Sequence, residues 1–169
     1  TLWYRSPEIL FDAFHYGPSA DMWSIGCVFG ELLLGRPMFP GHTAVEQADL
    51  IYGVLGVPTE QEWPGHSKLE GYVTPKTTQA HTKTDAKSQQ PSMLVHTFKH
   101  RLDAAGLDLL QRLLRYNPQS RISAAEALQH EYFTNNSPIM TPLDKMPSFR
   151  NIPRAKPKEL QEKGSDTPK

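Results

Sequence analysis

The longest apolar stretch of the chain lies between Ser19 and Leu34, and its pattern predicts a buried helix. Placed on a helix, its apolar residues surround the axis instead of forming one stripe: Met22, Trp23, Ile25, Cys27, Val28, Phe29, Leu32, Leu33 and Leu34. A helix without a polar face is normally buried on every side. We expect Ser19 to cap this helix and Gly35 to end it. The rest of the chain is then expected to pack around it.

Shorter patterns predict helices on both sides of this one. Pro7 suits the first turn of a short helix, where the carboxylate of Glu8 faces the positive end of the helix dipole. Thr43-x-x-Glu46 has the spacing of a capping box, in which two side chains satisfy free backbone N–H groups. The apolar face that follows it predicts a helix that ends at Gly56.

A second helical region is predicted after residue 102. Asp103 is a candidate N-cap for a helix with a leucine-rich stripe, which ends before Asn117-Pro118. Ser123-x-x-Glu126 is another capping box and opens the last predicted helix. Strand signals are few, so the sequence favours a mainly α fold.

Two polar segments fall outside this helical pattern. Residues 76–91 contain no large apolar side chain, so they cannot bury enough surface to offset their ordering entropy, and we expect a mobile loop. Residues 134–169 have recurring prolines among lysines and arginines, which predicts a Pro-rich, basic and flexible tail. The dispersed charges of the tail favour a solvated segment over a docking segment or a nuclear address.

Charge and composition argue against several classes of function. The 169 residues fit one domain or a large piece of one, and 18 basic residues balance 18 acidic ones. We therefore expect neither nucleic acid nor a membrane as a direct partner. The single cysteine, Cys27, excludes an internal disulfide, favours an intracellular setting and is interpreted as a core residue. The histidines are not joined by carboxylate or thiol clusters, so no metal site is predicted.

Three motifs occur in the order in which a protein kinase domain carries them. Trp3-Tyr4-Arg5-Ser6-Pro7-Glu8 resembles the end of a kinase activation segment, with Ser6 in place of the usual alanine. Asp21-Met22-Trp23-Ser24-Ile25-Gly26 is similar to the D-x-W-S-x-G of the central kinase helix. Asn117-Pro118-Gln119-Ser120-Arg121-Ile122 is similar to the late P-x-x-R motif. The resemblance covers residues 1–133 and implies the helical C-terminal lobe of the kinase fold, without the N-terminal lobe and the catalytic loop.

Within the kinases, the chain resembles the cyclin-dependent kinase family. The residues that carry this likeness are Thr1–Arg5 and the insert-like stretch Leu55–Gly65. A closer likeness is to the CDK-activating kinase subfamily, although the loop at 77–90 is longer and more polar than that group leads us to expect. The segments behind the closer likeness are Leu10-Phe11, Tyr16-Gly17, Asp21–Trp23, Gly71–Lys76 and Ala104–Leu110.

The resemblance implies a proline-directed Ser/Thr kinase that transfers the γ-phosphate of ATP with the help of Mg²⁺. In a kinase the groups that perform this chemistry precede the activation segment. The chain has no G-x-G-x-x-G loop, no V-A-I-K lysine, no H-R-D and no D-F-G. We therefore expect ATP and Mg²⁺ to be used by the intact kinase, and no catalytic residue, bound cofactor or phosphotransfer in this chain alone.

What the resemblance assigns to this chain is a platform for the protein substrate. Thr1 is similar to the threonine near the phospho-acceptor, and Arg5 to the arginine that shapes the pocket for the residue after it. A proline there leaves no N–H unsatisfied, which implies a preference for Ser/Thr-Pro sites. The alternatives are an ordinary loop threonine and a surface arginine.

Four further residues are given structural roles by the resemblance. Glu8 and Arg121 are similar to an ion pair that ties the activation segment to the late helices, the alternative being two unrelated surface charges. Asp21 is similar to the aspartate that holds the catalytic loop, and without that loop we expect it to face water, as a first-turn residue would. Trp23, in the D-x-W-S-x-G motif, is the fourth. Apart from the resemblance, Trp3, Trp23 and Trp63 are interpreted as packing residues, the alternative being residues that stack on a ligand.

The partners and location follow from the same resemblance. The intact kinase is expected to need a cyclin, to act on protein substrates with Ser/Thr-Pro sites, and to bind a small docking subunit near Trp63. A nuclear or nucleo-cytoplasmic location is implied. The second hypothesis is a non-catalytic docking or scaffold module derived from a kinase lobe, which would bind partners through the helix near Thr43 and the stretch near Trp63.

Overall fold

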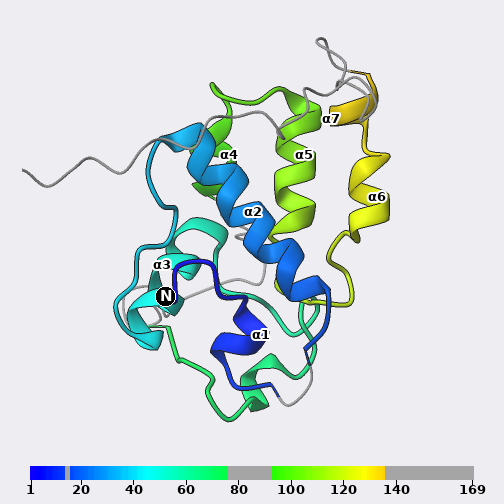
Figure 1. Cartoon of the computed structure of the whole chain (residues 1–169). Coiled ribbons are helices and arrows are strands. Elements are labelled where there is room, and N and C mark those ends of the chain that lie inside the picture. The colour runs from blue at the N-terminus through cyan, green and yellow to red at the C-terminus, as the bar shows by residue number, and fades with distance from the viewer. Residues whose placement is uncertain (14–15, 76–92, 136–169) are drawn as a thin grey trace, which may run out of the picture. The chain divides into compact units, whose positions relative to one another are not determined.

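The computed structural model describes residues 1–13, 16–75 and 93–135, and every regular element within these ranges is helical. Figure 1 shows α2 crossing the middle of the described residues, with α3 on one side of it and α5, α6 and α7 on the other. The expected polar loop at 76–91 and residues 136–169 of the expected tail lie outside the described residues. Residue 134, where the tail was expected to begin, is helical. The elements are α1 (Pro7–Leu10), α2 (Ser19–Leu34), α3 (Ala44–Leu55), the 3-10 turn η1 (His66–Lys68), α4 (Met93–Phe98), α5 (Ala104–Leu113), α6 (Ala124–Leu128) and α7 (Glu131–Thr134).

Helix α2 ends where the sequence predicts. Gly35 takes the left-handed conformation (φ +70°), and its N–H donates to the carbonyl of Glu31 at 2.8 Å. This φ favours glycine, which has no Cβ to clash. The prediction that Ser19 caps the helix is wrong, because Pro18 is the N-cap and already has a helical backbone conformation. Ser19 therefore lies inside the first turn, where its side chain does not cap the helix.

One side of α2 is packed tightly into the core. Trp23 is fully buried and Cys27 is 1% exposed. A Cβ on Gly26 would lie 2.8 Å from Leu114 Cδ2 and 3.0 Å from Leu113 Cβ, so a larger residue there would require these leucines to shift. Burial raises the pKa of the Cys27 thiol to about 12, which keeps it protonated and unreactive at neutral pH.

The expectation that α2 is buried on every side is wrong. Ile25, Val28 and Leu32 are 50%, 47% and 78% exposed. They lie along a groove of about 670 Å³ that α5, α6 and α7 border on the other side, for example through Leu128 and Phe133. An exposed apolar surface of this kind is typical of a contact with another segment or partner, and none of the described elements covers it.

Aromatic stacking holds the segment after α3 in place. The ring of Trp63 stacks on Phe11 at 6.0 Å between centroids and on Tyr116 at 6.3 Å, with interplanar angles of 18° in both pairs. The ring of His66 in η1 also stacks on Trp63, with 5.8 Å between the centroids. Trp63 is only 7% exposed, so it packs inside the molecule and offers little surface to a partner.

The capping predictions are confirmed at three helices. Glu46 N donates to Thr43 Oγ1 at 3.1 Å at the start of α3, and Gly106 N donates to Asp103 Oδ1 at 2.8 Å at the start of α5. The Ser123–Glu126 box at α6 is complete in both directions. At α3 the reciprocal bond differs, because Glu46 accepts from the N–H of His42 and not from that of Thr43.

Two helical features differ from the prediction. Helix α4 is not predicted, although Leu94 and Phe98 point into the core at the i, i+4 spacing of a helix. The last predicted helix is divided into α6 and α7, because the chain turns at Gln129 and His130 before α7 begins. None of the helices in the described residues is both long and apolar enough to cross a membrane.

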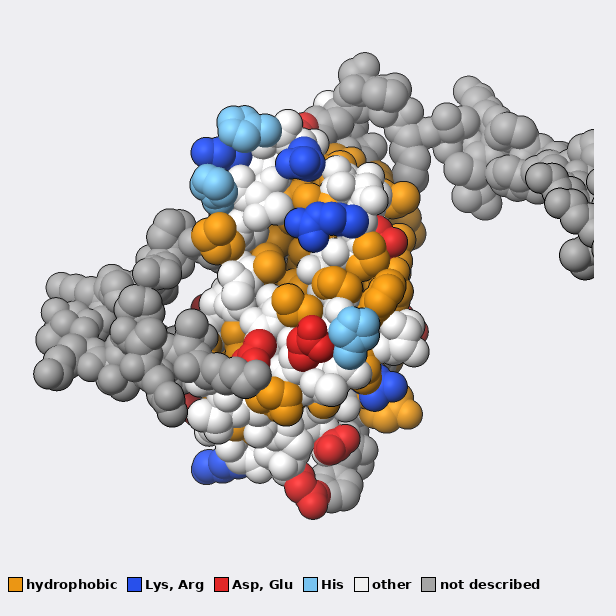
Figure 2. Space-filling view, turned by 90° about the vertical axis from the view of Figure 1, so that its left-hand side faces the viewer, with side chains coloured by type: hydrophobic (Ala, Val, Ile, Leu, Met, Phe, Trp, Pro, Cys, Tyr) orange, Lys and Arg blue, Asp and Glu red, His pale blue; other side chains and the backbone are white. Residues whose placement is uncertain are grey.

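The surface carries both signs of charge. On the face shown in Figure 2, hydrophobic side chains are interspersed with charged ones, and basic side chains lie near the top of the view and again lower down, beside acidic ones. This mixture agrees with the balanced composition of the chain, in which 18 basic residues match 18 acidic ones. Such a face has no extended field of one sign to steer a charged partner over long distances.

Candidate functional site

The opening segment, Thr1–Arg5, is anchored to two helices through its middle residues. The hydroxyl of Tyr4 donates to Glu31 Oε2 at 2.6 Å, and the hydroxyl of Ser24 donates to the carbonyl of Tyr4 at 2.8 Å. From α3, Gln47 Nε2 donates to the carbonyl of Trp3 at 3.3 Å. Two consecutive main-chain carbonyls and one side chain are therefore fixed, which positions the residues at both ends of the segment.

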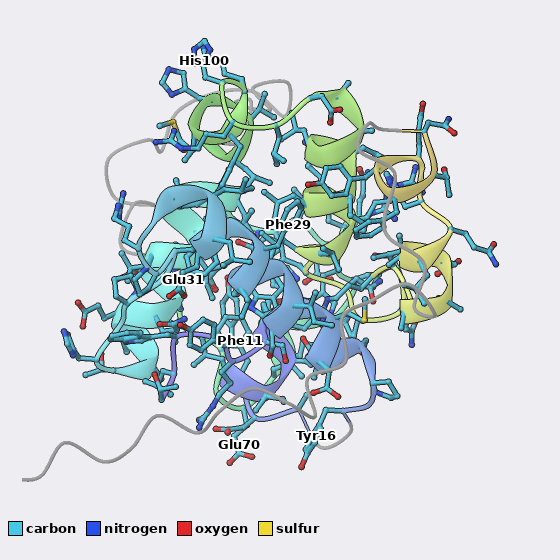
Figure 3. All side chains as sticks on the ribbon, turned by 45° about the horizontal axis from the view of Figure 1, so that its top comes forward. Phe11, Tyr16, Phe29, Glu31, Glu70 and His100 are labelled. Carbon is cyan, nitrogen blue, oxygen red and sulfur yellow. The ribbon has the colours of Figure 1, made fainter. Side chains whose placement is uncertain are left out.

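Glu31 has an electrostatic effect on the phenol that it binds. Its carboxylate accepts the hydrogen bond from Tyr4 and, with partial desolvation, raises the pKa of the Tyr4 hydroxyl above its ordinary value. The phenol therefore remains a proton donor across the physiological range. Figure 3 shows Glu31 on the side of α2 that faces α3, whereas Phe29 lies on the side toward α5.

Thr1 and Arg5 both lie on the surface at the ends of this anchored segment. The N–H of Trp3 donates to Thr1 Oγ1 at 3.4 Å, and the N–H of Arg5 donates to the carbonyl of Leu2 at 3.0 Å. The second bond closes a turn across Trp3 and Tyr4. The structure thus places two exposed polar residues, Thr1 and Arg5, at the two ends of one ordered backbone segment.

Glu8 and Arg121, which the sequence analysis paired, are in direct contact. Arg121 Nη1 lies 2.8 Å from Glu8 Oε1, and Nη2 lies 2.9 Å from Oε2. The two side chains are 2% exposed or less. The remaining donors of the guanidinium bond the carbonyls of Ser19, Arg115 and Tyr116 at 2.6–3.1 Å. All five N–H donors of Arg121 therefore have acceptors.

Trp23 and Asp21 lie at opposite extremes of burial. The ring of the fully buried Trp23 has the Arg121 guanidinium carbon 5.3 Å from its centroid, so it forms the floor of the ion pair. Asp21 is exposed in the first turn of α2. The structure brings Trp23, Glu8 and Arg121 together and leaves Asp21 facing solvent.

Three anchoring residues escape the sequence analysis: Ser24, Glu31 and Gln47. Ser24 stands inside the D-x-W-S-x-G motif, but the motif does not say which group its hydroxyl meets. Glu31 looks like an interruption of the apolar pattern on α2. Gln47 is fully buried although it stands in a first helical turn, where polar residues are usually exposed. The signal that could have identified Gln47 was a polar residue on the apolar, buried face of an amphipathic helix.

A second charged cluster joins α5 to the start of α7. Asp108 Oδ2 lies 2.9 Å from His130 Nε2 and 2.8 Å from Arg112 Nε. Burial alone would raise the pKa of Asp108, but the hydrogen bond from His130 and the charge of Arg112 bring it below its ordinary value. The cluster fastens two helices. In the part of the chain that the structure describes, no three His, Cys, Asp or Glu side chains are grouped so as to hold a metal ion.

The motifs and the geometry agree with one family. The model of the protein kinase domain matches residues 1–133. The chain belongs to the protein kinase family. Its curated relatives place this kinase chain among the cyclin-dependent kinases, as the resemblance of Thr1–Arg5 and Leu55–Gly65 predicts.

Two rice kinases are similar over most of the kinase chain. It is 45% identical over 149 residues to cyclin-dependent kinase G-1 of Oryza sativa subsp. indica, which covers 88% of the chain and 21% of that protein. It is 44% identical over 135 residues to cyclin-dependent kinase B2-1 of Oryza sativa subsp. japonica, which covers 80% of the chain and 38% of that protein. The chain thus spans well under half of the length of these relatives.

A solved structure shows the same relationship in three dimensions. A chain in the CAK complex from Chaetomium thermophilum, bound to ATP-γ-S, matches the kinase chain with a TM-score of 0.69 and 39% sequence identity. The match covers 84% of this chain and 42% of that one. At this identity the likeness supports the family as well as the fold.

Proposed function

We propose that the chain forms the C-terminal lobe of a proline-directed, cyclin-dependent Ser/Thr protein kinase, and that its opening segment is the platform for the protein substrate. The order of the three motifs supports the lobe assignment. The coverage of kinase relatives, which is 38% for cyclin-dependent kinase B2-1, is in keeping with it. The chain would then supply substrate positioning, while other parts of a kinase domain supply the chemistry.

The anchoring of Trp3 and Tyr4 is the observation that carries this proposal. A substrate platform has to hold its recognition groups still, because ordering them at the moment of binding would cost affinity. The main chain on the N-terminal side of Arg5 is fixed from α2 by Ser24 and from α3 by Gln47. Arg5 itself is exposed and therefore accessible to a peptide.

ATP and Mg²⁺ belong to the intact kinase in this proposal. Among the described residues, no three His, Cys, Asp or Glu side chains are grouped so as to hold a metal ion. The proposal assigns Mg²⁺ to the other parts of a kinase domain. Mg-ATP supplies the phosphoryl group and neutralises its charge when it is bound to a kinase. In this proposal the chain holds a Ser/Thr-Pro segment of the substrate in position. Arg5 then lies beside the proline, and Thr1 lies near the hydroxyl that accepts the phosphate.

The partners are proposed by the same reasoning. The names of the relatives and of the CAK complex support a cyclin as the activating partner, and the CDK-activating kinase group as the nearest subfamily. A small docking subunit near Trp63 would have to bind exposed neighbours such as Val57, which is 44% exposed, because Trp63 itself is buried. We place the kinase inside the cell, in the nucleus or shared between nucleus and cytoplasm.

Peptide phosphorylation tests the proposal. A longer kinase that contains this chain, purified with its cyclin, should phosphorylate Ser-Pro peptides with a kcat/KM about tenfold or more above that for matched Ser-Ala peptides. The 169-residue chain alone should transfer no phosphate to either peptide. Equal rates on the two peptides, or phosphotransfer by the chain alone, would contradict the proposal.

A non-catalytic docking module is the second candidate. The observation in its favour is the apolar groove along Ile25, Val28 and Leu32, which is open in this structure. In the catalytic hypothesis the rest of a kinase domain covers this groove. Transcripts distinguish the two, because the first hypothesis expects the kinase motifs to be encoded upstream in the same reading frame, and the second expects a short form that is expressed stably.

A further inference from the structure

The amide of Gln47 occupies a buried position between the opening segment and the loop that precedes α3. Its side chain is fully buried, and its Oε1 accepts from the N–H of Gly41 at 3.0 Å. Its Nε2 donates to the carbonyl of Trp3 at 3.3 Å. One amide thereby joins two loops that are 44 and 6 residues away from it in sequence.

The two bonds determine which way the amide faces. The N–H of Gly41 can only donate, so the Gln47 atom beside it has to be the oxygen. The nitrogen is then directed toward Trp3, whose carbonyl can only accept. A Cβ on Gly41 would lie 2.6 Å from Gln47 Oε1, so the glycine allows the close approach that fixes the oxygen. The donor toward Trp3 is therefore held in place before any peptide binds.

We propose that Gln47 is a positioning residue for substrate recognition, which holds the Trp3 carbonyl so that Arg5 is presented to the residue after the phospho-acceptor. The inference rests on the proposed function. Ser24 holds the next carbonyl, that of Tyr4, from the opposite helix. With both carbonyls fixed, the backbone has little freedom left before Arg5, whose own N–H closes the turn onto Leu2 at 3.0 Å. Loss of the Gln47 bond would release one of the two constraints.

The isosteric variant Gln47→Glu removes the donor and keeps the shape. While it is ionised, the introduced carboxylate can still accept from Gly41, but it presents an oxygen to the Trp3 carbonyl, and the two acceptors repel. Burial favours the protonated carboxyl, whose O–H could donate to Trp3, so a variant with no polar group is needed beside it. The matched control is Glu46→Gln, which makes the reverse change on the neighbouring residue. Glu46 is exposed and accepts from the N–H of His42, so it has no bond to the opening segment. Gln47→Met, which has a similar volume and no polar group, is the second test variant.

Hydrogen exchange on the 169-residue chain tests the positioning without any assumption about catalysis. The Arg5 amide should exchange about tenfold faster in Gln47→Glu and in Gln47→Met than in the wild type, since an opposed or missing bond weakens the turn. Glu46→Gln should leave the exchange unchanged. Unchanged exchange in both Gln47 variants would overturn the inference, as would unfolding of both, which would make Gln47 a residue of the core.

Peptide kinetics on the longer kinase with its cyclin test the consequence. Gln47→Glu should reduce the Ser-Pro to Ser-Ala ratio of kcat/KM about tenfold, with kcat for the Ser-Ala peptide unchanged. A wild-type ratio near one would show that the proposed function has failed. A high wild-type ratio that persists in Gln47→Glu would overturn the role of Gln47 alone.

Discussion

Glu8 and Arg121 stand 113 positions apart in sequence and form a two-point ion pair at 2.8 and 2.9 Å in the interior of the kinase chain. The pair joins α1, at the end of the opening segment, to the loop before α6. Because both side chains are almost fully buried, removal of one would leave the other charge without a partner and without solvation by water. The contact therefore fastens the segment that follows Arg5 to the late helices.

Removing one partner of this pair should destabilise the chain strongly. We expect Glu8→Gln or Arg121→Met to cost about 3–5 kcal/mol of unfolding free energy, since each leaves a buried group unpaired. Urea denaturation followed by tryptophan fluorescence measures this. As a control, Arg112→Met breaks the half-exposed pair with Asp108 and should cost less than about 1 kcal/mol. Equal costs for the two arginines would show that burial of the Glu8 pair is unimportant.

Ser6 and Ser24 should respond in opposite directions to the same substitution. The Ser6 hydroxyl is buried and has no hydrogen-bond partner among the described residues, whereas the Ser24 hydroxyl bonds Tyr4 at 2.8 Å. Ser6→Ala should leave stability unchanged or raise it by up to about 1 kcal/mol, and Ser24→Ala should lower it by about 1 kcal/mol. Urea midpoints of the two variants provide the comparison. A Ser6→Ala variant that is the less stable of the two would contradict this interpretation.

The cluster at Asp108 predicts that the free energy of unfolding decreases as the pH falls. The pKa of Asp108 in the folded chain is below its ordinary value, so its contribution is present above the unfolded pKa and is lost as pH falls through the folded one. Asp108→Asn should therefore lose less stability than the wild type between about pH 5 and pH 2. Because Asp108 is 45% exposed, the difference should stay below about 1 kcal/mol. Parallel pH profiles of the two proteins would refute the assignment.

The open groove along α2 should bind hydrophobic probes in the isolated chain. Leu32 is 78% exposed, so Leu32→Lys should change stability by no more than about 0.5 kcal/mol while it lowers the fluorescence of a bound naphthalene-sulfonate dye. Val45→Lys, on an exposed part of α3 outside the groove, is the matched control. Dye binding that falls equally in both variants would show that the groove is not the binding surface.

The sequence was informative at most positions where a local pattern determines a local structure; the Ser19 cap was the exception, because Pro18 already has a helical backbone conformation. The caps at Thr43, Asp103 and Ser123 and the glycine that ends α2 follow from backbone groups that need partners or from a left-handed φ. The family followed from motif order. Periodicity did not show which elements cover α2, because burial depends on segments distant in the chain. It also missed α4, where two buried residues are too few for a periodic pattern.

The contacts of the anchoring side chains could not be predicted from local sequence patterns, because their partners are distant in sequence. Tyr4 and Glu31 are 27 residues apart, and Gln47 and Trp3 are 44 apart, so only the folded arrangement brings each pair together. The pairing of Glu8 with Arg121 came from the resemblance to kinases. No spacing rule connects two charges at that separation.

Arg5 offers the most direct test of the claim that the opening segment reads the residue after the phospho-acceptor. The measurement is kcat/KM for matched Ser-Pro and Ser-Ala peptides with the longer kinase, its cyclin and Mg-ATP, in the wild type, Arg5→Ala and Arg36→Ala. Arg36 is an exposed arginine just beyond the C-terminal end of α2 and serves as the charge-matched control. We predict a wild-type preference for Ser-Pro of about tenfold or more, kept in Arg36→Ala and reduced to near one in Arg5→Ala. A preference that survives in Arg5→Ala would contradict the claim.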